Sequence, residues 1–387
     1  MGEPGQADAE PRAVRFALSE RQRVAWLRLY RTDNVGPATF RDLINHCGSA
    51  ERALAMLPEL STRGGRRRYP QIPSAEDAQA EIDGLAAIGA RLVGIGEADY
   101  PDLLRLVEHA PPLIAVKGEP AALHRPAISI VGSRNASMAG LTMARRLAGD
   151  LGAGGHVIVS GLARGIDGAA HEAALATGTI AVLAGGIDRP YPPQNAQLLD
   201  RIASGGAGCA VTEMPLGWEP RARDFPRRNR IIAGLSLGLV VVEAAARSGS
   251  LISARLAGEM GRIVMAVPGS PLDPRAHGTN MLIRDGATLV TGAADVREAL
   301  APLDGAPAPP EPRSALEPEG TMTVPPDDDA RARLVSLLGP TPTAVDDLIA
   351  ETGLSASQVF LIVLELDLAE RIERHSGNRI SLVVGHA

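Results

Sequence analysis

The 387-residue chain is poor in cysteine and in aromatic residues, and it has no long apolar run. Its two cysteines, Cys47 and Cys209, lie far apart in the sequence and match no spacing of metal ligands or of a disulfide framework. We therefore expect free thiols in a reducing cytoplasm. No apolar run approaches the roughly 18 residues of a membrane span, so we expect no membrane segment. Aromatic residues make up 3% of the chain, which leaves one or two rings at most for base stacking.

Net charge and length set further limits. The formal net charge of -6 argues against a protein that is basic all over. If the ligand is nucleic acid, the positive charge must gather on one face. Residues 1–14 are polar and carry Pro, Gly and acids, without the hydrophobic segment of a secretion signal, so we expect a disordered tail. The length allows two or three domains.

The central stretch, residues 128–167, alternates apolar runs with small-residue turns. The run 128–131 predicts a buried strand, and the turn 132–135 leads into a predicted helix at about 138–151. A second strand at 157–159 is followed by the turn 160–167 and another helix. This alternation is typical of a parallel sheet. Each turn joins the carboxyl end of a strand to a helix N-terminus, where free N–H groups and the helix dipole favour an anion.

The same alternation continues toward the C-terminus. Two more glycine-containing turns follow strands, at 184–188 and at 247–250. In the predicted strand 239–243 every residue before Glu243 is apolar, so we expect a central strand that is buried on both faces. The sequence therefore predicts an α/β fold over residues 73–300, with a doubly wound, mostly parallel Rossmann-like sheet of six or seven strands. Further strands are expected at 179–183, 210–213, 263–267 and 287–290.

Smaller units flank this domain. Residues 15–72 predict a small helical domain, whose helix, Val-Gly-Pro turn and helix are typical of SAM-like and helix-hairpin-helix folds. Two roles stay open for that turn: it binds a phosphate through its backbone N–H groups, or it is part of a structural scaffold with no role in binding. Residues 301–329 are dense in Pro and acids and predict a linker. Residues 330–387 predict a winged helix. Its third helix, at 358–368, holds the place of a recognition helix, but it is apolar and carries Glu365 and Asp367, which favours a protein-contact or structural module.

Several motifs follow one another along the chain: Ile130-Val131-Gly132-Ser133-Arg134, Ser160 to Asp167 with Ala170-His171, Gly185 to Asp188 with Tyr191-Pro192 and Asn195, Phe225-Pro226 with Arg228 to Gly234, Ser248 to Leu251, Val267-Pro268-Gly269, and Gly278-Thr279-Asn280 with Leu282-Ile283. In this order they resemble the motifs of the DprA/Smf (DNA-processing protein A) family. The resemblance covers nearly the whole chain outside the tail and linker. It implies a single-stranded DNA-binding protein that protects incoming DNA in natural transformation and loads the RecA recombinase, working as a homodimer through the Rossmann-like domain. One departure is Thr212-Glu213-Met214-Pro215, where many relatives have an aromatic residue in place of Met214.

The predicted DNA-binding site lies where the four strand-end turns meet along one edge of the sheet. Glycine N–H groups and arginine guanidinium groups there can bind phosphates, with Arg221 and Arg223 nearby. Phe225 or Tyr191 can stack on a base. The predicted set is Gly132, Ser133, Arg134, Ser160, Gly161, Arg164, Gly165, Asp167, Gly186, Asn195, Phe225, Arg227, Arg228, Asn229, Arg230, Ser248 and Ser250.

Two other function classes stay open. The first is an enzyme that processes nucleotides or nucleoside monophosphates, with Asp167 and His171 as an acid/base pair. The alternative roles are that Asp167 caps its helix and that His171 bonds to backbone or phosphate. The turns lack Gly-x-Gly-x-x-Gly and a P-loop, and the histidines form no visible metal cluster, so neither a cofactor nor catalysis is expected. The second alternative is a protein-interaction scaffold, which leaves the arginine-bearing turns unexplained.

Overall fold

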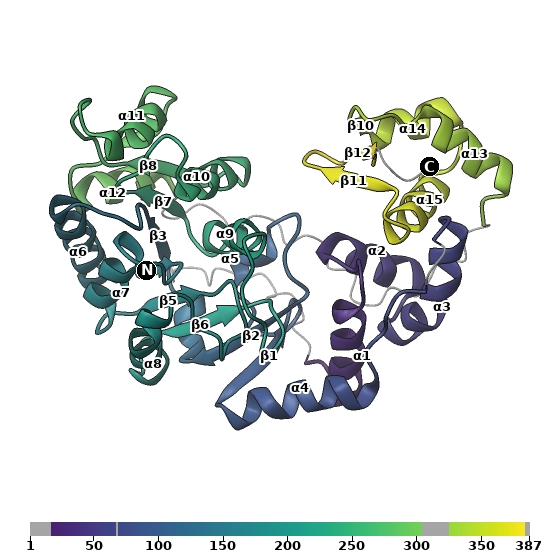
Figure 1. The fold of residues 1–387 in the computed structure, drawn as a ribbon, viewed down its shortest axis with the longest axis horizontal. Coiled ribbons are helices and arrows are strands. Elements are labelled where there is room, and N and C mark those ends of the chain that lie inside the picture. The colour runs from purple at the N-terminus through teal and green to yellow at the C-terminus, as the bar shows by residue number, and fades with distance from the viewer. Residues whose placement is uncertain (1–16, 67–68, 304–324, 384–387) are drawn as a thin grey trace, which may run out of the picture.

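The computed structural model describes residues 17–66, 69–303 and 325–383 (Figure 1). The predicted tail at 1–14 and most of the predicted linker at 301–329 lie outside these residues. Figure 1 shows the sheet domain on one side of the molecule, and the N-terminal helices with the C-terminal unit on the other. Within the described residues, no helix is both long and apolar enough to cross a membrane.

Three helices form the N-terminal unit: α1 (Glu20–Arg31), α2 (Pro37–Cys47) and α3 (Ala50–Arg63). Ser49 caps α3, as the sequence predicts, and Ser19 closes a capping box at the start of α1. Pro37 occupies the first turn of α2, where its missing N–H costs no hydrogen bond. A fourth helix, α4 (Ala75–Ala87), begins at a Ser74 capping box and leads into the sheet.

The central sheet has nine strands in the order β1-β2-β6-β5-β4-β3-β7-β8-β9. Seven of them, from β6 to β9 in that order, pair in parallel, which confirms the predicted Rossmann-like sheet. The strands β1 and β2 extend one edge in antiparallel pairing. Their bounds are β1 Ala90–Gly94, β2 Leu113–Gly118, β3 Ala127–Val131, β4 Val157–Ser160, β5 Thr179–Val182, β6 Cys209–Thr212, β7 Gly238–Val241, β8 Ile263–Ala266 and β9 Thr288–Leu289.

Strand order fixes where a ligand can bind. From β3 the chain winds outward through β4, β5 and β6, and it then returns to the other side of β3 with β7. In doubly wound sheets, ligands bind at such a switch point, beyond the carboxyl ends of the strands. The turns that follow β3 and β7 flank this point, and the turn that follows β4 lies one strand away; all three carry residues of the predicted site.

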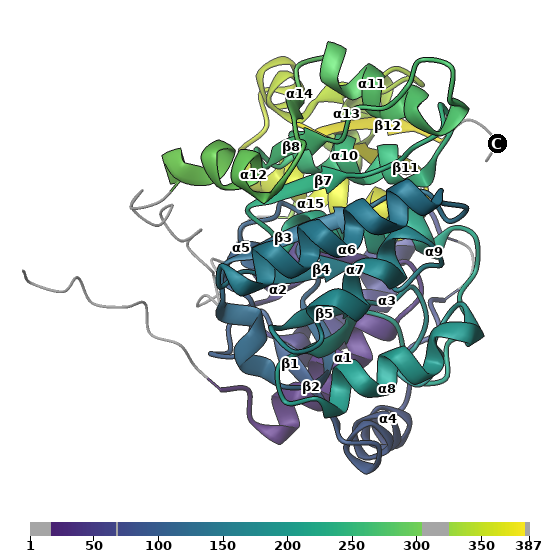
Figure 2. The same cartoon turned by 90° about the vertical axis from the view of Figure 1, so that its left-hand side faces the viewer.

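Helices cover both faces of the sheet. Ile128 and Ile130 point into a core with α6, α7 and α12, while Val131 and Leu239 point into a second core with α9 and α10. Figure 2 shows α6, α7 and α8 in front of the strands. The helix α9 begins at Asp224, three residues before the predicted start at Arg227. The helices are α5 Asp102–Arg105, α6 Met138–Ala153, α7 Ile166–Ala174, α8 Ala196–Ser204, α9 Asp224–Gly234, α10 Gly249–Glu259, α11 His277–Arg284 and α12 Ala293–Leu300, with 3-10 turns η1 Pro120–His124, η2 Pro193–Asn195, η3 Pro274–Ala276 and η4 Ala301–Leu303.

The C-terminal unit is the predicted winged helix. It contains three helices and a three-stranded sheet in the order β10-β12-β11, and the predicted terminal hairpin is confirmed. Its core is apolar and contains residues of every helix of the unit, among them Leu334, Leu348 and Ile362. The elements are α13 Asp328–Leu337, β10 Thr343–Ala344, α14 Val345–Thr352, α15 Ala356–Leu368, β11 Ile372–His375 and β12 Arg379–Leu382.

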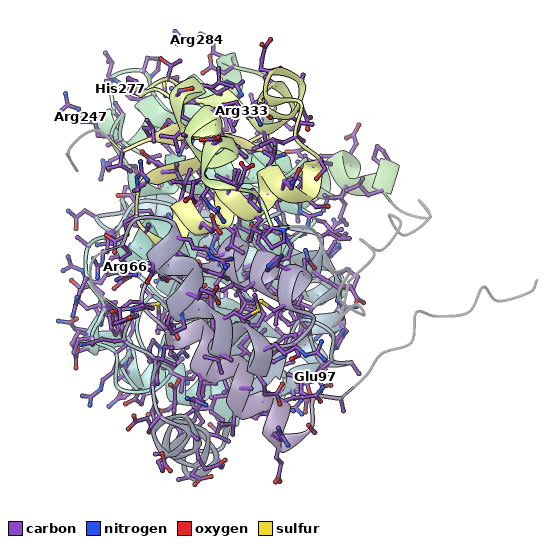
Figure 3. All side chains as sticks on the ribbon, turned by 90° about the vertical axis from the view of Figure 1, so that its right-hand side faces the viewer. Arg66, Glu97, Arg247, His277, Arg284 and Arg333 are labelled. Carbon is purple, nitrogen blue, oxygen red and sulfur yellow. The ribbon has the colours of Figure 1, made fainter. Side chains whose placement is uncertain are left out.

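The helix α15 packs against α2 and α3 and does not stand free. Leu361, Leu364 and Leu368 belong to the same core as the N-terminal helices. Arg374 pairs with Asp42 of α2 at 2.8 Å. Figure 3 views this side, with the winged helix lying against the N-terminal helices and Arg66, which donates to the Leu368 carbonyl at 3.1 Å, labelled. This face of α15 is therefore used for packing within the chain, which favours the structural alternative of the two that the sequence left open.

One continuous core joins the N-terminal helices to the sheet. It runs from Leu27 and Leu43 through Leu92 of β1 to Leu199 of α8. The predicted domain boundary near residue 72 therefore crosses a packed interface, because α4 contacts both α1 and β1. We infer that this boundary does not separate two independently mobile bodies.

Candidate nucleic-acid interface

A pocket of about 270 Å³ opens at the carboxyl ends of the parallel strands. The turn after β3 contributes Arg134, and the turn after β4 contributes residues 161, 163 and 164. The turn after β5 contributes residues 191–194, and α9 contributes Phe225 and Arg228. Parallel strands end at the same edge, so turns that are far apart in sequence meet here. The predicted residues that line the pocket are Arg134, Gly161, Arg164, Phe225 and Arg228.

Two side chains of α7 hold the turn after β4 in place through hydrogen bonds to its backbone. The N–H groups of Gly161 and Ala163 donate to Asp167 Oδ2 at 3.1 and 3.4 Å. The N–H of Leu162 donates to His171 Nε2 at 3.3 Å. The prediction that Asp167 caps its helix is wrong, since the N-cap is Gly165 and the carboxylate closes the preceding turn instead. The predicted backbone bond of His171 is confirmed.

The His171 ring is a neutral structural group. Because Nε2 accepts a hydrogen bond, Nδ1 carries the proton and donates to Thr179 Oγ1 at 2.7 Å, and that hydroxyl donates to the Ile158 carbonyl at 2.6 Å. Burial, together with the nearby positive charge of Arg228, lowers the pKa of His171 to about 3. Both ring nitrogens are occupied, and the ring is fully buried. An acid/base role for this residue therefore has no geometric support.

Arg228 forms the floor of the pocket and is 6% exposed. Its Nη1 donates to the carbonyls of Gly161 and Val182, each at 2.6 Å, and so joins the ends of β4 and β5. Burial lowers the pKa of this guanidinium to about 10, although Asp167 opposes the shift. A Cβ at position 161 would lie 2.2 Å from Nη1, so glycine is needed there to admit the arginine. Arg228 thus lines the pocket and also stabilises the fold by holding the ends of two strands together.

The rim of the pocket carries exposed groups suited to a polynucleotide. The guanidinium carbon of Arg134 lies 5.1 Å from the centre of the Phe225 ring. The centres of the Phe225 and Tyr191 rings are 5.4 Å apart, in an edge-to-face arrangement. Tyr191 is 46% exposed. In the part of the chain that the structure describes, neither Arg134 nor Arg164 forms an ion pair, and their N–H groups have no acceptor. Charge and backbone donors are therefore available to a phosphate.

Arg227 and Arg230 lie apart from this pocket. Both pair with Glu213, which is 3% exposed and directly follows β6; Arg227 Nε lies 2.9 Å from its carboxylate. The Tyr30 hydroxyl of α1 donates to the same carboxylate at 2.7 Å. Burial alone would raise the pKa of Glu213, but Arg230 and Arg227 outweigh it and hold that pKa below its ordinary value. These arginines fasten the N-terminal unit to the sheet and do not line the pocket, and their contact with DNA stays a prediction.

The other predicted residues shape the turns. Gly186 donates its N–H to the Trp218 carbonyl at 2.9 Å, so that group does not point to the pocket as predicted. Gly165 has a φ of 78° and packs against the Ser133 carbonyl, where a Cβ would come within 2.3 Å. Direct contact with DNA remains a prediction for all of these residues. Ser160 donates to Ile130 O, Asn195 to Leu162 O and Asn229 to Gly249 O; Ser248 caps α10 and bonds Ser250, and Gly132 packs on Ile166.

Sequence reasoning missed the polar residues that position the site. Glu213 and Asp224 are buried carboxylates: Glu213 binds Tyr30 of the distant N-terminal unit, and Asp224 binds Trp218 on the loop that precedes it. The sequence does contain one indication that Glu213 belongs to the site. A carboxylate directly after a buried strand lies at the same edge of the sheet as the strand-end turns. No described group of three or more His, Cys, Asp and Glu side chains could hold a metal ion.

Comparison with known proteins places these features in context. A family profile described as DNA recombination-mediator protein A matches residues 91–301, one described as a DprA-like N-terminal HHH domain matches residues 20–84, and one described as a DprA winged helix domain matches residues 306–378. Protein Smf of Escherichia coli (strain K12) is 40% identical over 286 residues, which cover 73% of this chain and 75% of the relative. DNA processing protein DprA of Bacillus subtilis (strain 168) is 40% identical over 235 residues, covering 60% and 76%.

Two solved structures are similar as well. The X-ray structure of DNA processing protein A from Streptococcus pneumoniae superposes with a TM-score of 0.56 and 36% identity, covering 68% of this chain and 86% of that one. DNA processing protein A from Helicobacter pylori superposes with a TM-score of 0.50 and 27% identity, covering 55% and 96%. That structure is described as showing a single-stranded DNA binding mode.

Proposed function

The chain belongs to the DprA/Smf family of DNA recombination-mediator proteins, and from this premise we propose that it binds single-stranded DNA at the strand-end pocket in DNA recombination. The observation that carries the proposal is the rim of the pocket. There, Arg134 and Arg164 have no carboxylate partner among the residues that the structure describes, and Arg134 lies over the Phe225 ring. Exposed guanidinium groups beside aromatic rings are the arrangement that single-stranded nucleic acid requires.

The binding mode follows from the geometry of the rim. Arg134 and Arg164 both line the pocket, so a phosphate bound there meets two guanidinium groups. The exposed Tyr191 ring offers a stacking surface to a base that has no partner strand. Bases in a duplex are stacked on each other and cannot reach it. We therefore expect sequence-independent binding with a preference for single strands.

Two finer parts of the proposal rest on the family alone. We infer that the chain protects incoming DNA and loads the RecA recombinase in natural transformation, and that it works as a homodimer. Light scattering at increasing protein concentration tests the dimer. A strand-exchange assay, in which DNA is first covered by a single-strand binding protein, tests RecA loading. No gain in RecA activity on addition of this protein would remove that part of the proposal while leaving DNA binding intact.

The competing proposal is a nucleotide-processing enzyme. Its predicted acid/base pair, Asp167 and His171, is buried and holds the turn after β4, so the pair does not favour catalysis. Filter binding with a labelled oligonucleotide, run beside incubation with free nucleoside monophosphates, separates the two. Retention of the oligonucleotide with unchanged monophosphates supports the proposal. Release of base or phosphate from the monophosphates would support the enzyme.

A further inference from the structure

A second pair of an arginine and an aromatic ring lies beside the pocket, on the loop between β6 and α9. The guanidinium carbon of Arg221 lies 4.6 Å from the centre of the Trp218 ring. Arg221 is exposed and Trp218 is partly exposed. The sequence predicted only that Arg221 lies near the site, and Trp218 was not part of the predicted set.

The carboxylate of Asp224 fixes this pair in place. Its Oδ2 accepts the Trp218 indole N–H at 2.9 Å and the backbone N–H of Arg221 at 2.8 Å, and the residue is 4% exposed. The Trp218 carbonyl in turn accepts the N–H of Gly186 at 2.9 Å, which binds the loop to the turn after β5. The ring and the arginine backbone are therefore held before any ligand arrives, which lowers the entropy cost of binding.

The charge of Arg221 is also available. Within the described residues it forms no ion pair, whereas Arg189 on the neighbouring turn pairs with Asp188 and Glu219, both at 3.2 Å. Asp224 immediately precedes Phe225, and the guanidinium of Arg134 lies over the Phe225 ring. The two arginine–aromatic pairs thus meet at the first turn of α9, and a strand that leaves the pocket can pass from one to the other.

We propose that Trp218 and Arg221 form a second subsite, at which a further nucleobase of the bound strand stacks and its phosphate meets the guanidinium. This inference rests on the proposed single-stranded DNA binding. It extends the contact beyond the pocket, so it affects only oligonucleotides long enough to occupy both places. If the pair serves only to fasten its own loop, the length of the oligonucleotide has no bearing on the effect of its removal.

Tryptophan fluorescence tests this directly, because the chain has two tryptophans. Trp26 is 2% exposed in the N-terminal core, so W26F leaves Trp218 as the reporter. Titration of W26F with oligothymidylates of increasing length is expected to quench Trp218 emission once both subsites are filled, in step with retention on filters. Binding on filters with unchanged emission at every length would overturn the subsite.

Substitutions provide the second arm. W218L and R221A are expected to weaken binding of long oligothymidylates by roughly fivefold to 100-fold, as loss of one stacked base does, and to change binding of the shortest retained ones little. W218F keeps a ring and is expected to restore most of the affinity. R146A, which removes an exposed arginine of α6 paired with Asp150, is the charge-matched control. Equal affinities of R221A and R146A at all lengths would refute the subsite, whereas wild-type protein that retains no oligonucleotide would refute the proposed function.

Discussion

The guanidinium of Arg134 lies 5.1 Å from the centre of the Phe225 ring and joins the turn after β3 to the first turn of α9. These residues are 91 positions apart in the sequence, and they meet because β3 and α9 both end or begin at the same edge of the sheet. A cation on an aromatic face stays solvated on its outer side, so it can still bind a phosphate. The pair therefore presents charge and ring to the same ligand.

Removal of Arg134 should weaken DNA binding equally for every base sequence, because its guanidinium is proposed to contact the phosphate backbone of the DNA. R134A is expected to lose affinity equally for oligonucleotides of different sequence. It should also reduce the slope of log K against log salt by about 0.7, the value for one phosphate contact on a single strand. Filter binding at several salt concentrations measures both, with R146A as control. A loss confined to one base composition would contradict a backbone contact.

Loss of the Phe225 ring should cost affinity in a different way. F225L is expected to weaken binding of single strands by about 1–3 kcal/mol, as removal of a stacked aromatic does, with little change in the salt slope. F225Y keeps the ring and should bind nearly as the wild type does. If F225L bound normally, the ring would be a packing residue of the pocket and not a stacking surface.

Arg230 should behave unlike Arg134, although sequence reasoning gave both the same role. Arg230 and Arg227 pair with the buried Glu213, so E213Q leaves two guanidinium groups without their carboxylate, and R230A leaves the buried carboxylate with one cation in place of two. Each is expected to lower the free energy of unfolding by about 3–5 kcal/mol. Chemical denaturation measures this loss. The salt slope of the folded R230A protein should match that of the wild type, and a slope reduced as in R134A would place Arg230 on the DNA.

Acid should destabilise the fold through His171. Its pKa is about 3 in the native protein and about 6.5 in the unfolded chain, so the unfolded state binds the proton first as pH falls. The neutral ring contributes fully above pH 6.5, and stability falls by about 1.4 kcal/mol per pH unit from there toward pH 3. Denaturation of the wild type and H171Q across this range checks the difference in slope. Parallel slopes would show that His171 is protonated in the fold.

The sequence was sufficient to predict the sheet and the edge at which its turns meet. The apolar runs and small-residue turns specify parallel strands, and parallel strands end together. It was not sufficient to predict which arginines face the pocket. Arg227, Arg228 and Arg230 lie on one helix, where each residue turns by about 100°, so they cannot all point one way. Their directions depend on Glu213 and Tyr30, which are distant in sequence and meet α9 only in the folded chain.

The central claim is that the arginine-bearing rim grips a bare polynucleotide without making or breaking a bond. Its most direct test is the affinity of the wild-type protein for one labelled oligonucleotide, single-stranded and as a duplex, across a range of salt concentrations. If about five phosphates are neutralised, log K for the single strand should fall with log salt at a slope near -3.5, and the duplex should bind more weakly at each concentration. Equal affinity for the duplex, or an affinity that salt leaves unchanged, would contradict the claim.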